Sequence, residues 1–227
     1  MKGMFKLTVF LTVIAMMAKS AYATPMLKIS SGGATCTLGD GDVAAVCGGG
    51  GTGSGDILAG AGLVAGSFSV GNFSVNVSTG ITKPAQGSAA FPFMDLNTVN
   101  TSSGGGGTLV LEFSETGFTG TGLSNIFWGG TAAGTATYQV FYDPGNVLFA
   151  ATTQLGTSGL QGPGAYSGTI TGGAASGTYS LTQRVTYVHQ GSGVSSGDHA
   201  LSIPEPGILS LLGVGLASIG LIRRRLS

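Results

Sequence analysis

The stretch TYSLTQRVTYVHQ, residues 178–190, decides the fold class of this chain. Four of its side chains recur at every second position and therefore share one face of an extended strand: Tyr179, Leu181, Val185 and Tyr187. Gln183 stands in the same register and interrupts this otherwise apolar face. Alternation of this kind predicts a β-strand with one face in a core.

Two further segments alternate in the same way, SFSVGNFSVNVSTGI at 67–81 and TLVLEFSE at 108–115, and a third, TATYQVFYDPGN at 135–146, is rich in aromatic residues and valine, as strands are. In the first, the apolar phase changes at Gly71-Asn72, which predicts a turn or a bulge. The third ends in Pro-Gly-Asn, a sequence typical of turns. Shorter strands are expected at 27–30 and 198–203.

We therefore expect a mainly β fold of about eight to ten short strands, an antiparallel β-sandwich of jelly-roll or immunoglobulin-like character. No segment of the body has the 3.6-residue apolar period and the caps of a helix. A β-helix is the alternative that the glycine content suggests, with 43 glycines in 227 residues. Its repeats would recur at a fixed period, and the glycine-rich phrases of this chain do not.

Residues 1–23 have the pattern of a secretory signal peptide, which would pass through the Sec translocon. A start with two lysines precedes the apolar run 7–18, and small residues stand at −3 and −1 of a cut between Ala23 and Thr24. The alternative is a membrane anchor. It would need roughly 20 apolar residues, whereas this run has twelve.

The body between the chain ends, residues 24–203, is expected to be one extracytoplasmic domain. It contains three basic and eight acidic residues and so has a net charge of −5, although the whole chain is neutral. Such a body has no basic surface for nucleic acid. Low charge and abundant Gly, Ser and Thr suit an exported protein.

Cys36 and Cys47 are the only cysteines, and ten residues separate them. In an exported protein, an isolated close pair predicts a disulfide. A metal site is the alternative, but two cysteines without nearby histidines do not supply the usual four ligands. A redox-active pair would favour two intervening residues.

The body offers few groups for chemistry, and we predict no catalytic residue, metal or cofactor. His189 and His199 stand beside turn-like sequences and are interpreted as solvated residues at strand ends. Glu112 and Glu115 are expected to be solvated charges that do not converge, because residues three apart on a strand point to opposite faces. Asp40-Gly41-Asp42 matches only the start of a calcium-loop pattern, so calcium binding there is disfavoured.

Trp128 is the only tryptophan of the chain. With Phe127 and Tyr138 it could form the aromatic platform of a carbohydrate-binding site. A lone tryptophan in a β-sandwich is more often a core residue, because aromatic side chains bury a large area. The core interpretation is therefore favoured.

The chain ends IPEPGILSLLGVGLASIGLIRRRLS, residues 203–227. Three parts follow one another there: the motif Pro204, Glu205 and Pro206, the apolar segment 207–222, and the basic cluster Arg223, Arg224 and Arg225. As a helix, the apolar segment would be about 24 Å long, somewhat short for a bilayer core of about 30 Å. The basic cluster would stay on the cytoplasmic side, which places the body outside.

This arrangement resembles the PEP-CTERM sorting signal of Gram-negative bacteria, and the resemblance covers residues 204–227. It implies recognition by an exosortase, a membrane protease that acts near the Pro-Glu-Pro motif, in bacteria that make exopolysaccharide. The precursor would be anchored in the inner membrane, and the processed protein would lie at the cell surface or outside the cell. A plain anchor that is never cut is the alternative. A buried core helix is disfavoured, because it would not need a terminal arginine cluster.

Three functions follow as hypotheses. The first is a non-enzymatic cell-surface or extracellular-matrix protein with a structural, adhesive or exopolysaccharide-associated role. The second is a secreted carbohydrate-binding module that uses Trp128, and the third is a secreted hydrolase that uses His189 or His199. We favour the first, because the sequence holds a sorting signal and no G-x-S-x-G or comparable catalytic motif.

Overall fold

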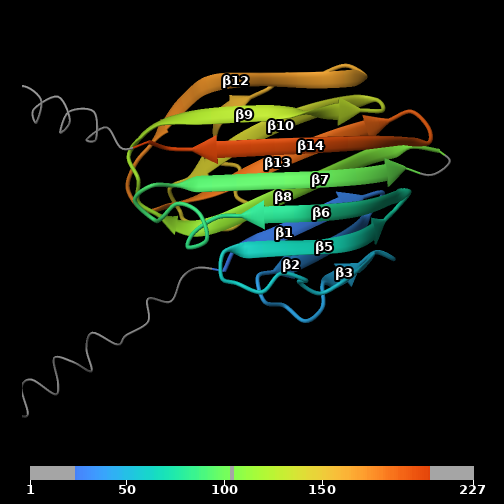
Figure 1. The fold of residues 1–227 in the computed structure, drawn as a ribbon, viewed down its shortest axis with the longest axis horizontal. Helices are drawn as coiled ribbons and strands as arrows, with labels where there is room; N and C mark the ends of the chain where they lie inside the picture. Colours follow the sequence, from blue (N-terminus) through green and yellow to red (C-terminus); the bar gives the residue numbers. More distant parts are fainter. Residues whose placement is uncertain (1–23, 103–104, 205–227) are drawn as a thin grey trace, which may run out of the picture.

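The computed structural model describes residues 24–102 and 105–204, which form two antiparallel β-sheets stacked face to face (Figure 1). All regular elements of these residues are strands, so the predicted mainly β fold is confirmed, and the two packed sheets are consistent with a β-sandwich. The predicted signal peptide, 1–23, and the predicted transmembrane helix, 207–222, lie outside the described residues.

The first sheet contains seven strands in the order β11-β10-β13-β8-β1-β2-β3. Their bounds are β11 Thr153–Thr157, β10 Thr135–Asp143, β13 Tyr179–His189, β8 Gly107–Phe118, β1 Met26–Ser31, β2 Ala34–Gly39 and β3 Val46–Gly48. The stretch 178–190 thus forms β13 as predicted, between β10 and β8. Its register pairs Val185 with Tyr138 on one side and with Leu111 on the other, so apolar residues of three strands lie in one row.

The second sheet also contains seven strands, in the order β12-β9-β14-β7-β6-β5-β4. Their bounds are β12 Gly164–Ala175, β9 Gly122–Ala132, β14 Gly193–Ser202, β7 Phe93–Ser102, β6 Phe73–Ile81, β5 Leu63–Val70 and β4 Thr52–Gly53. Val70 pairs with Phe73, so Gly71-Asn72 is the two-residue turn of a hairpin, as the change of phase predicts. Gly71 has a φ of 55°, a left-handed conformation that glycine adopts without steric cost.

Consecutive strands cross repeatedly from one sheet to the other. From β7 onward, β7, β9, β12 and β14 belong to the second sheet, and β8, β10, β11 and β13 to the first. The pairs β9/β10, β11/β12 and β13/β14 contact each other across the sandwich. The last two strands of the chain each lie between two strands that precede them in the sequence: β13 between β8 and β10, and β14 between β7 and β9. The sandwich is therefore complete only when the C-terminal end of the body is in place.

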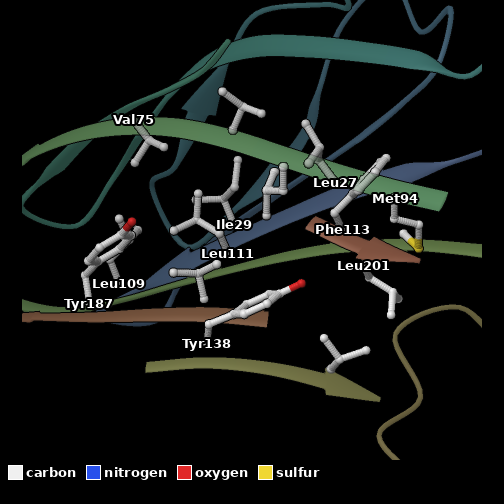
Figure 2. Close-up of a cluster of buried hydrophobic side chains, with 14 of the residues drawn as sticks. Leu27, Ile29, Val75, Met94, Leu109, Leu111, Phe113, Tyr138, Tyr187 and Leu201 are labelled. Atoms are coloured by element: carbon white, nitrogen blue, oxygen red, sulfur yellow. The ribbon is translucent and has the colours of Figure 1, made fainter. Parts of the chain in front are cut away.

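The hydrophobic core fills the space between the two sheets (Figure 2). Its largest fully buried side chains include Tyr138, Tyr179, Tyr187, Phe73, Phe113 and Phe118. Burial of a large apolar side chain stabilises a fold by roughly 1.5–3 kcal/mol. Within the described residues, the core begins at Leu27 in β1 and ends at Ile203 just after β14.

Gln183, the polar interruption of the apolar face of β13, joins the two sheets. Its Nε2 donates to the Tyr138 hydroxyl at 2.7 Å in the first sheet. It also lies 3.2 Å from the carbonyl oxygens of Met94 and His199 in the second sheet. Because a buried amide is stable only when hydrogen-bonded, this side chain helps to fix the position of one sheet against the other.

The outer faces of the two sheets differ in what covers them. On the first sheet, the loop 144–152 folds over the strands. The Phe149 amide donates to Ser114 Oγ at 3.0 Å, and Ser180 Oγ donates to the Val147 carbonyl at 2.6 Å. On the second sheet, two hollows remain open to solvent, so a candidate site for a partner lies there.

Both ends of the body lie at the same end of the sandwich (Figure 1). β1 begins there, where Met26 pairs with Ser114 near the end of β8. At the other end of the body, the Ile203 amide donates to the Pro92 carbonyl at 3.0 Å, just before β7 begins. Ile203 is buried and Pro204 is exposed, so the Pro-Glu-Pro motif starts directly at the folded body.

Candidate functional site

A hollow on the outer face of the second sheet brings together an exposed aromatic ring and two carboxylates. Its outward-facing residues come from β7, β9, β12 and β14: Asp95, Phe127, Ser167, Thr169, Asp198 and Ala200. We call it the Phe127 groove; it is an open hollow of about 510 Å³. Phe127 is 47% exposed, whereas aromatic rings of a sandwich are usually placed in its core.

The register of four strands explains why these residues meet. Phe127 on β9 pairs with Thr169 on β12 and with Ala200 on β14, and Ala200 pairs with Asp95 on β7. Directly paired residues lie on one face of the sheet with Cβ atoms about 5 Å apart. Asp198 stands two residues before Ala200 and therefore shares this face as a diagonal neighbour of Asp95. Ala200, at the bottom of the groove, has a small side chain that leaves the space above it open.

The groove carries negative charge that no basic residue of the second sheet's described strands offsets. Partial burial, together with the nearby Asp198 charge, raises the pKa of Asp95 from 3.8 to about 6. The three basic side chains of the body lie elsewhere, in ion pairs with Glu112 or Glu115. A partly buried carboxyl with a raised pKa beside a second carboxylate is a feature common at functional sites.

We expect Asp95→Asn to stabilise the body at neutral pH. The folded protein keeps the Asp95 proton up to a pKa of about 6, whereas the unfolded chain releases it near 3.8. The wild type therefore loses stability as the pH rises through this interval, and asparagine removes that loss. With solvent screening taken into account, the gain should be about 1–2 kcal/mol at pH 7.5 and should fall below about 0.5 kcal/mol at about pH 4. Urea unfolding at the two pH values measures it.

Asp198→Asn is the matched control for this prediction. It removes the exposed charge next to Asp95 and leaves the more buried carboxyl in place, so its gain should be smaller over the same pH range. Equal stability of the wild type and Asp95→Asn at pH 7.5 would mean that the Asp95 carboxylate costs nothing in the folded protein.

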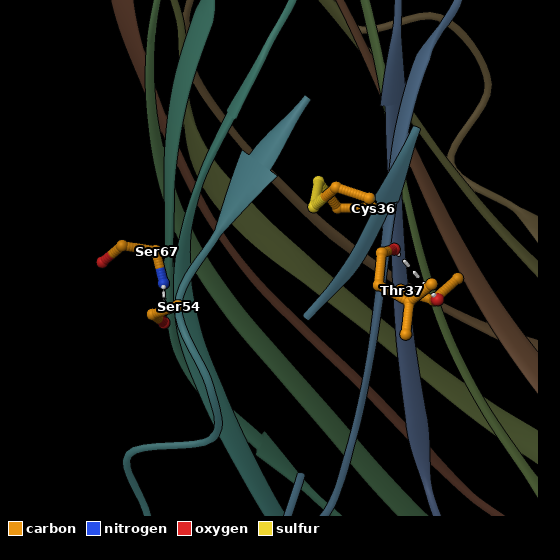
Figure 3. The surroundings of a disulfide bond; sticks show 6 residues. Cys36, Thr37, Ser54 and Ser67 are labelled. Atoms are coloured by element: carbon orange, nitrogen blue, oxygen red, sulfur yellow. Dashed lines mark hydrogen bonds between the residues drawn. A yellow bond between two sulfur atoms is a disulfide. The ribbon is translucent and has the colours of Figure 1, made fainter. Parts of the chain in front are cut away.

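A second hollow lies on the same outer face, over β4, β5, β6 and part of β7. Apart from Val99, its outward-facing residues carry hydroxyl or amide groups: Thr52, Ser54, Ser67, Ser69, Ser74 and Asn76. We call it the serine hollow. The Ser67 amide donates to Ser54 Oγ at 3.0 Å and holds the segment after β4 against β5 (Figure 3). Val99 follows Asp95 by four residues on β7, so the two hollows are neighbours, about 13 Å apart along that strand.

Of the three rings predicted to form the platform, Phe127 is exposed in the groove, Trp128 does not provide the exposed ring, and Tyr138 is buried in the core. Its neighbour Phe127 points outward, and alternation along β9 places Trp128 on the inward face with Ile126. Trp128 is partly buried and packs against the hydrophobic core. Its indole lies over Gly168 of β12, where any Cβ would collide with the ring. Trp128 borders the groove, but Phe127 is the residue that offers a flat surface to solvent.

Both histidines are buried, so the interpretation of them as solvated strand-end residues is wrong. His189 is 3% exposed, with Nε2 2.7 Å from Ser195 Oγ and Nδ1 2.7 Å from Ser102 Oγ. His199 is 1% exposed, and burial lowers its pKa to about 4. Neither ring lines either of the two hollows. Their turn-like neighbours are misleading, because both side chains lie on inward faces.

Glu112 is buried rather than solvated, which corrects the prediction. It lies on β8 between two basic residues that the sheet register places directly beside it, Lys28 on β1 and Arg184 on β13. Its carboxylate is 2.7 Å from Lys28 Nζ and 2.7 Å from Arg184 Nη2. These cross-strand partners, distant in sequence, compensate its charge.

Glu115 is also buried, and the prediction of a solvated charge is wrong for it as well. Its carboxylate accepts hydrogen bonds from Lys83 Nζ at 2.5 Å and from Thr82 Oγ1 at 2.6 Å. Burial raises the pKa of Glu115, and these two hydrogen bonds oppose the rise. Glu112 and Glu115 have separate partners, so they do not converge as a catalytic carboxylate pair would.

Cys36 and Cys47 form the predicted disulfide (Figure 3). They are directly paired residues of β2 and β3, at one edge of the first sheet. Closing a loop of this size stabilises a fold by about 2–3 kcal/mol in the chain-entropy model. Since β3 has only three residues, the bond holds a short edge strand in register.

The predicted sorting residues lie at or beyond the ends of the described chain. Thr24 and Pro204 are described and exposed. Outside the described residues lie Ala23, Glu205, Pro206, Arg223, Arg224 and Arg225. Within 24–102 and 105–204, no helix has the length and apolar character to cross a membrane. In the same residues, no three His, Cys, Asp or Glu side chains are grouped as metal ligands would be.

Comparison with known proteins assigns no family to the chain. No protein-family model matches it, and no curated protein matches it. The residues themselves define the class: a two-sheet β body with an open acidic and aromatic groove, followed at once by a Pro-Glu-Pro motif.

Proposed function

We propose that this protein is an exported, non-enzymatic protein of the cell surface or extracellular matrix, sorted by its C-terminal segment. The observation that carries the proposal is the junction of body and tail, where the buried Ile203 is followed directly by the exposed Pro204 and the rest of the motif. Proline disfavours helix and sheet, so a motif at this place remains accessible to a membrane protease of the exosortase type.

In this proposal, the body lies outside the cytoplasmic membrane. The signal peptide, 1–23, directs export through the Sec translocon. The apolar segment 207–222 anchors the precursor in the inner membrane, with the arginines 223–225 on the cytoplasmic side. Since both ends of the body lie at one end of the sandwich, that end faces the membrane in the precursor. The outer face of the second sheet is then free for partners.

A binding or structural role suits the body better than catalysis. His189 and His199 are enclosed between the sheets, and Glu112 and Glu115 are engaged in ion pairs. The groups of a hydrolytic site would have to reach a substrate in a hollow. The histidines that the hydrolase hypothesis requires line neither hollow.

We further propose that strands β7–β14 form a jelly roll, the first of the two sandwich types expected from the sequence. Their order is β12-β9-β14-β7 in one sheet and β11-β10-β13-β8 in the other. Eight strands that alternate between two sheets in this way are typical of a double Greek key. Strands β1–β6 extend both sheets beyond β7 and β8.

Intact mass spectrometry of the protein from its native host tests the sorting proposal. We expect a mature chain that begins at Thr24 and lacks the segment beyond the Pro-Glu-Pro motif. Replacing Pro204, Glu205 and Pro206 together by alanine should leave the tail attached, which separates specific processing from general trimming. A wild-type chain that still ends in Arg-Arg-Arg-Leu-Ser would overturn the proposal and favour a plain C-terminal anchor.

Carbohydrate binding is a second candidate function. The observation that favours it is the Phe127 groove, which combines an exposed aromatic ring with two carboxylates on an open sheet face. The two functions are compatible, because a matrix protein can be retained by the polymer around it.

A further inference from the structure

The outer face of the second sheet has no part in the proposed sorting, which depends on the C-terminal segment. The Phe127 groove and the serine hollow are neighbours on it. Among the described strands of this sheet, Asp95 and Asp198 are the only charged residues, and no Lys or Arg is present. The remaining outward groups around the hollows are mainly hydroxyls and amides with one aromatic ring.

We propose that this face binds a strand of neutral polysaccharide, with Phe127 stacked on a sugar ring and with Asp95 and Asp198 as acceptors for sugar hydroxyls. This inference deepens the matrix role proposed above and rests on it only for the source of the polymer. Binding itself is a property of the body and can be measured without the tail.

Phe127 supplies the apolar part of the site. Its paired neighbours, Thr169 and Ala200, are small, so its ring is accessible from the solvent side. Leaving apolar surface in water costs about 25 cal/mol per Å². The C–H face of a pyranose ring covers such a surface, while the hydroxyl groups around its rim remain free for polar contacts.

The two carboxylates supply the polar part. An ionised carboxylate only accepts hydrogen bonds, with room for about four, so vicinal hydroxyls of a sugar can donate to one group together. Asp95 and Asp198 come from adjacent strands and face the same side. In the free protein, partial burial and mutual repulsion disfavour the Asp95 charge. A charge that lowers stability beside an exposed ring is better explained by a ligand than by folding.

The charge of the face selects among polysaccharides. Uronate or sulfate groups would be repelled by Asp95 and Asp198, with no cation in the strands of this sheet to receive them. A cationic amino sugar is the competing ligand. The serine hollow favours a neutral chain, because its Ser, Thr and Asn side chains match hydroxyl groups and carry no charge.

The dimensions of the face suit a polymer rather than a single sugar. In sheet order, β9 and β4 are separated by five strand steps. At about 4.8 Å per step this distance is about 24 Å. A glycan strand stacked on Phe127 would therefore cross β14 and β7 and reach the serine hollow, where several further sugar units find hydroxyl partners.

Affinity gel electrophoresis of the recombinant body, residues 24–204, tests the inference. Separate gels contain a neutral glucan, mannan or galactan, or anionic alginate, and chitosan oligosaccharides serve as competitors. We expect retardation by at least one neutral polymer, none by alginate, and no stronger competition by chitosan oligosaccharides than by neutral ones. Phe127→Ala should weaken the binding about tenfold, and Asp198→Asn about fivefold.

Leu123→Ala is the matched control, because Leu123 is 56% exposed on β9 and lies outside the groove. It should bind like the wild type, and urea unfolding of every variant verifies the fold. Asp95→Asn gives a signature that a purely structural role would not produce. It should bind about fivefold more weakly while being more stable at neutral pH.

If none of the three neutral polymers retards the protein, the inference is overturned. Retardation that Phe127→Ala leaves unchanged would also overturn it. Preference for alginate or for chitosan oligosaccharides would overturn the assignment of a neutral ligand. These results are separate from the test of sorting. Loss of the tail in the host together with no polysaccharide binding would remove this inference alone, and a retained tail with specific binding would remove only the sorting proposal.

Discussion

Lys83→Ala should destabilise the body by about 3–5 kcal/mol, a large part of the 5–15 kcal/mol that typically stabilises a domain. The Lys83 ammonium donates to Glu115 and to the Thr116 carbonyl, at 2.5 Å and 2.8 Å. It also lies 4.5 Å from the centroid of the Phe118 ring. Without it, Thr82 is the one side-chain donor among the described residues that the fully buried Glu115 carboxylate keeps. Urea unfolding of the body at pH 7.5 measures the loss.

Lys28→Ala is the matched control for this loss. Lys28 also forms an ion pair with a glutamate, at 2.7 Å from Glu112, but its side chain is 35% exposed. Glu112 moreover keeps Arg184 as a partner. The control should therefore cost less than about 1 kcal/mol. Equal losses for Lys83→Ala and Lys28→Ala would show that burial does not increase the importance of the Lys83 pair.

The pH dependence of Lys83→Ala gives a further check. In the variant, the pKa of Glu115 rises further, because the Lys83 hydrogen bond and charge no longer oppose the effect of burial, so the protonated form is favoured in the folded state. Stability is then greatest at low pH and falls as the pH rises above the ordinary value of 4.5. The deficit relative to the wild type should consequently shrink as the pH is lowered toward 5, whereas a deficit caused only by lost packing would not change.

The strands that the sequence predicts best are those with regular alternation. β8, β10 and β13 each present apolar residues at every second position, because one face of each lies on the core. The hairpin of β5 and β6 is predictable from the change of phase at Gly71-Asn72. In these places the hydrophobic pattern and the turn residues agree, and both report the same local geometry.

The strands that the hydrophobic pattern does not predict are rich in glycine. β12, with the sequence GAYSGTITGGAA, lies at the edge of the second sheet and has only two buried residues, Tyr166 and Ala175. Its partner β9 contains Gly129 and Gly130, which weaken the alternation after Ile126. Edge strands bury little, so their pattern is faint, and their existence depends on pairing with strands distant in sequence. The expected eight to ten strands therefore become fourteen in the described residues.

The candidate groove could not be predicted from the sequence for a different reason. Asp95 and Asp198 are far apart in the sequence, and only the pairing of β7 with β14 makes them neighbours. In the predicted platform of Trp128, Phe127 and Tyr138, the parity of β9 decides which ring of that strand is exposed. Ile126 and Trp128 share the inward face, so Phe127 must point outward. That signal is local and could have been found in the sequence.

A chain that ends at Ser192 should fail to fold, whereas one that ends at Pro204 should fold fully. The missing strand, β14, lies in the interior of the second sheet and pairs with both β7 and β9. Without it, the ladder that joins the two halves of this sheet is lost, and the core loses Leu201 and Ile203. Near-UV circular dichroism and urea unfolding should show a cooperative transition for 24–204 and none for 24–192.

A point variant separates the role of β14 from the effect of shortening the chain. Leu201→Ala should cost about 2–5 kcal/mol, because it opens a cavity in the core. Ser202→Ala, one residue later and on the outward face, should change stability by less than about 0.5 kcal/mol. A cooperative transition in 24–192 would show that the second sheet can close without its C-terminal strand. If β14 is required and the body is exported as proposed, the fold is completed only after the ten residues of β14 have crossed the membrane.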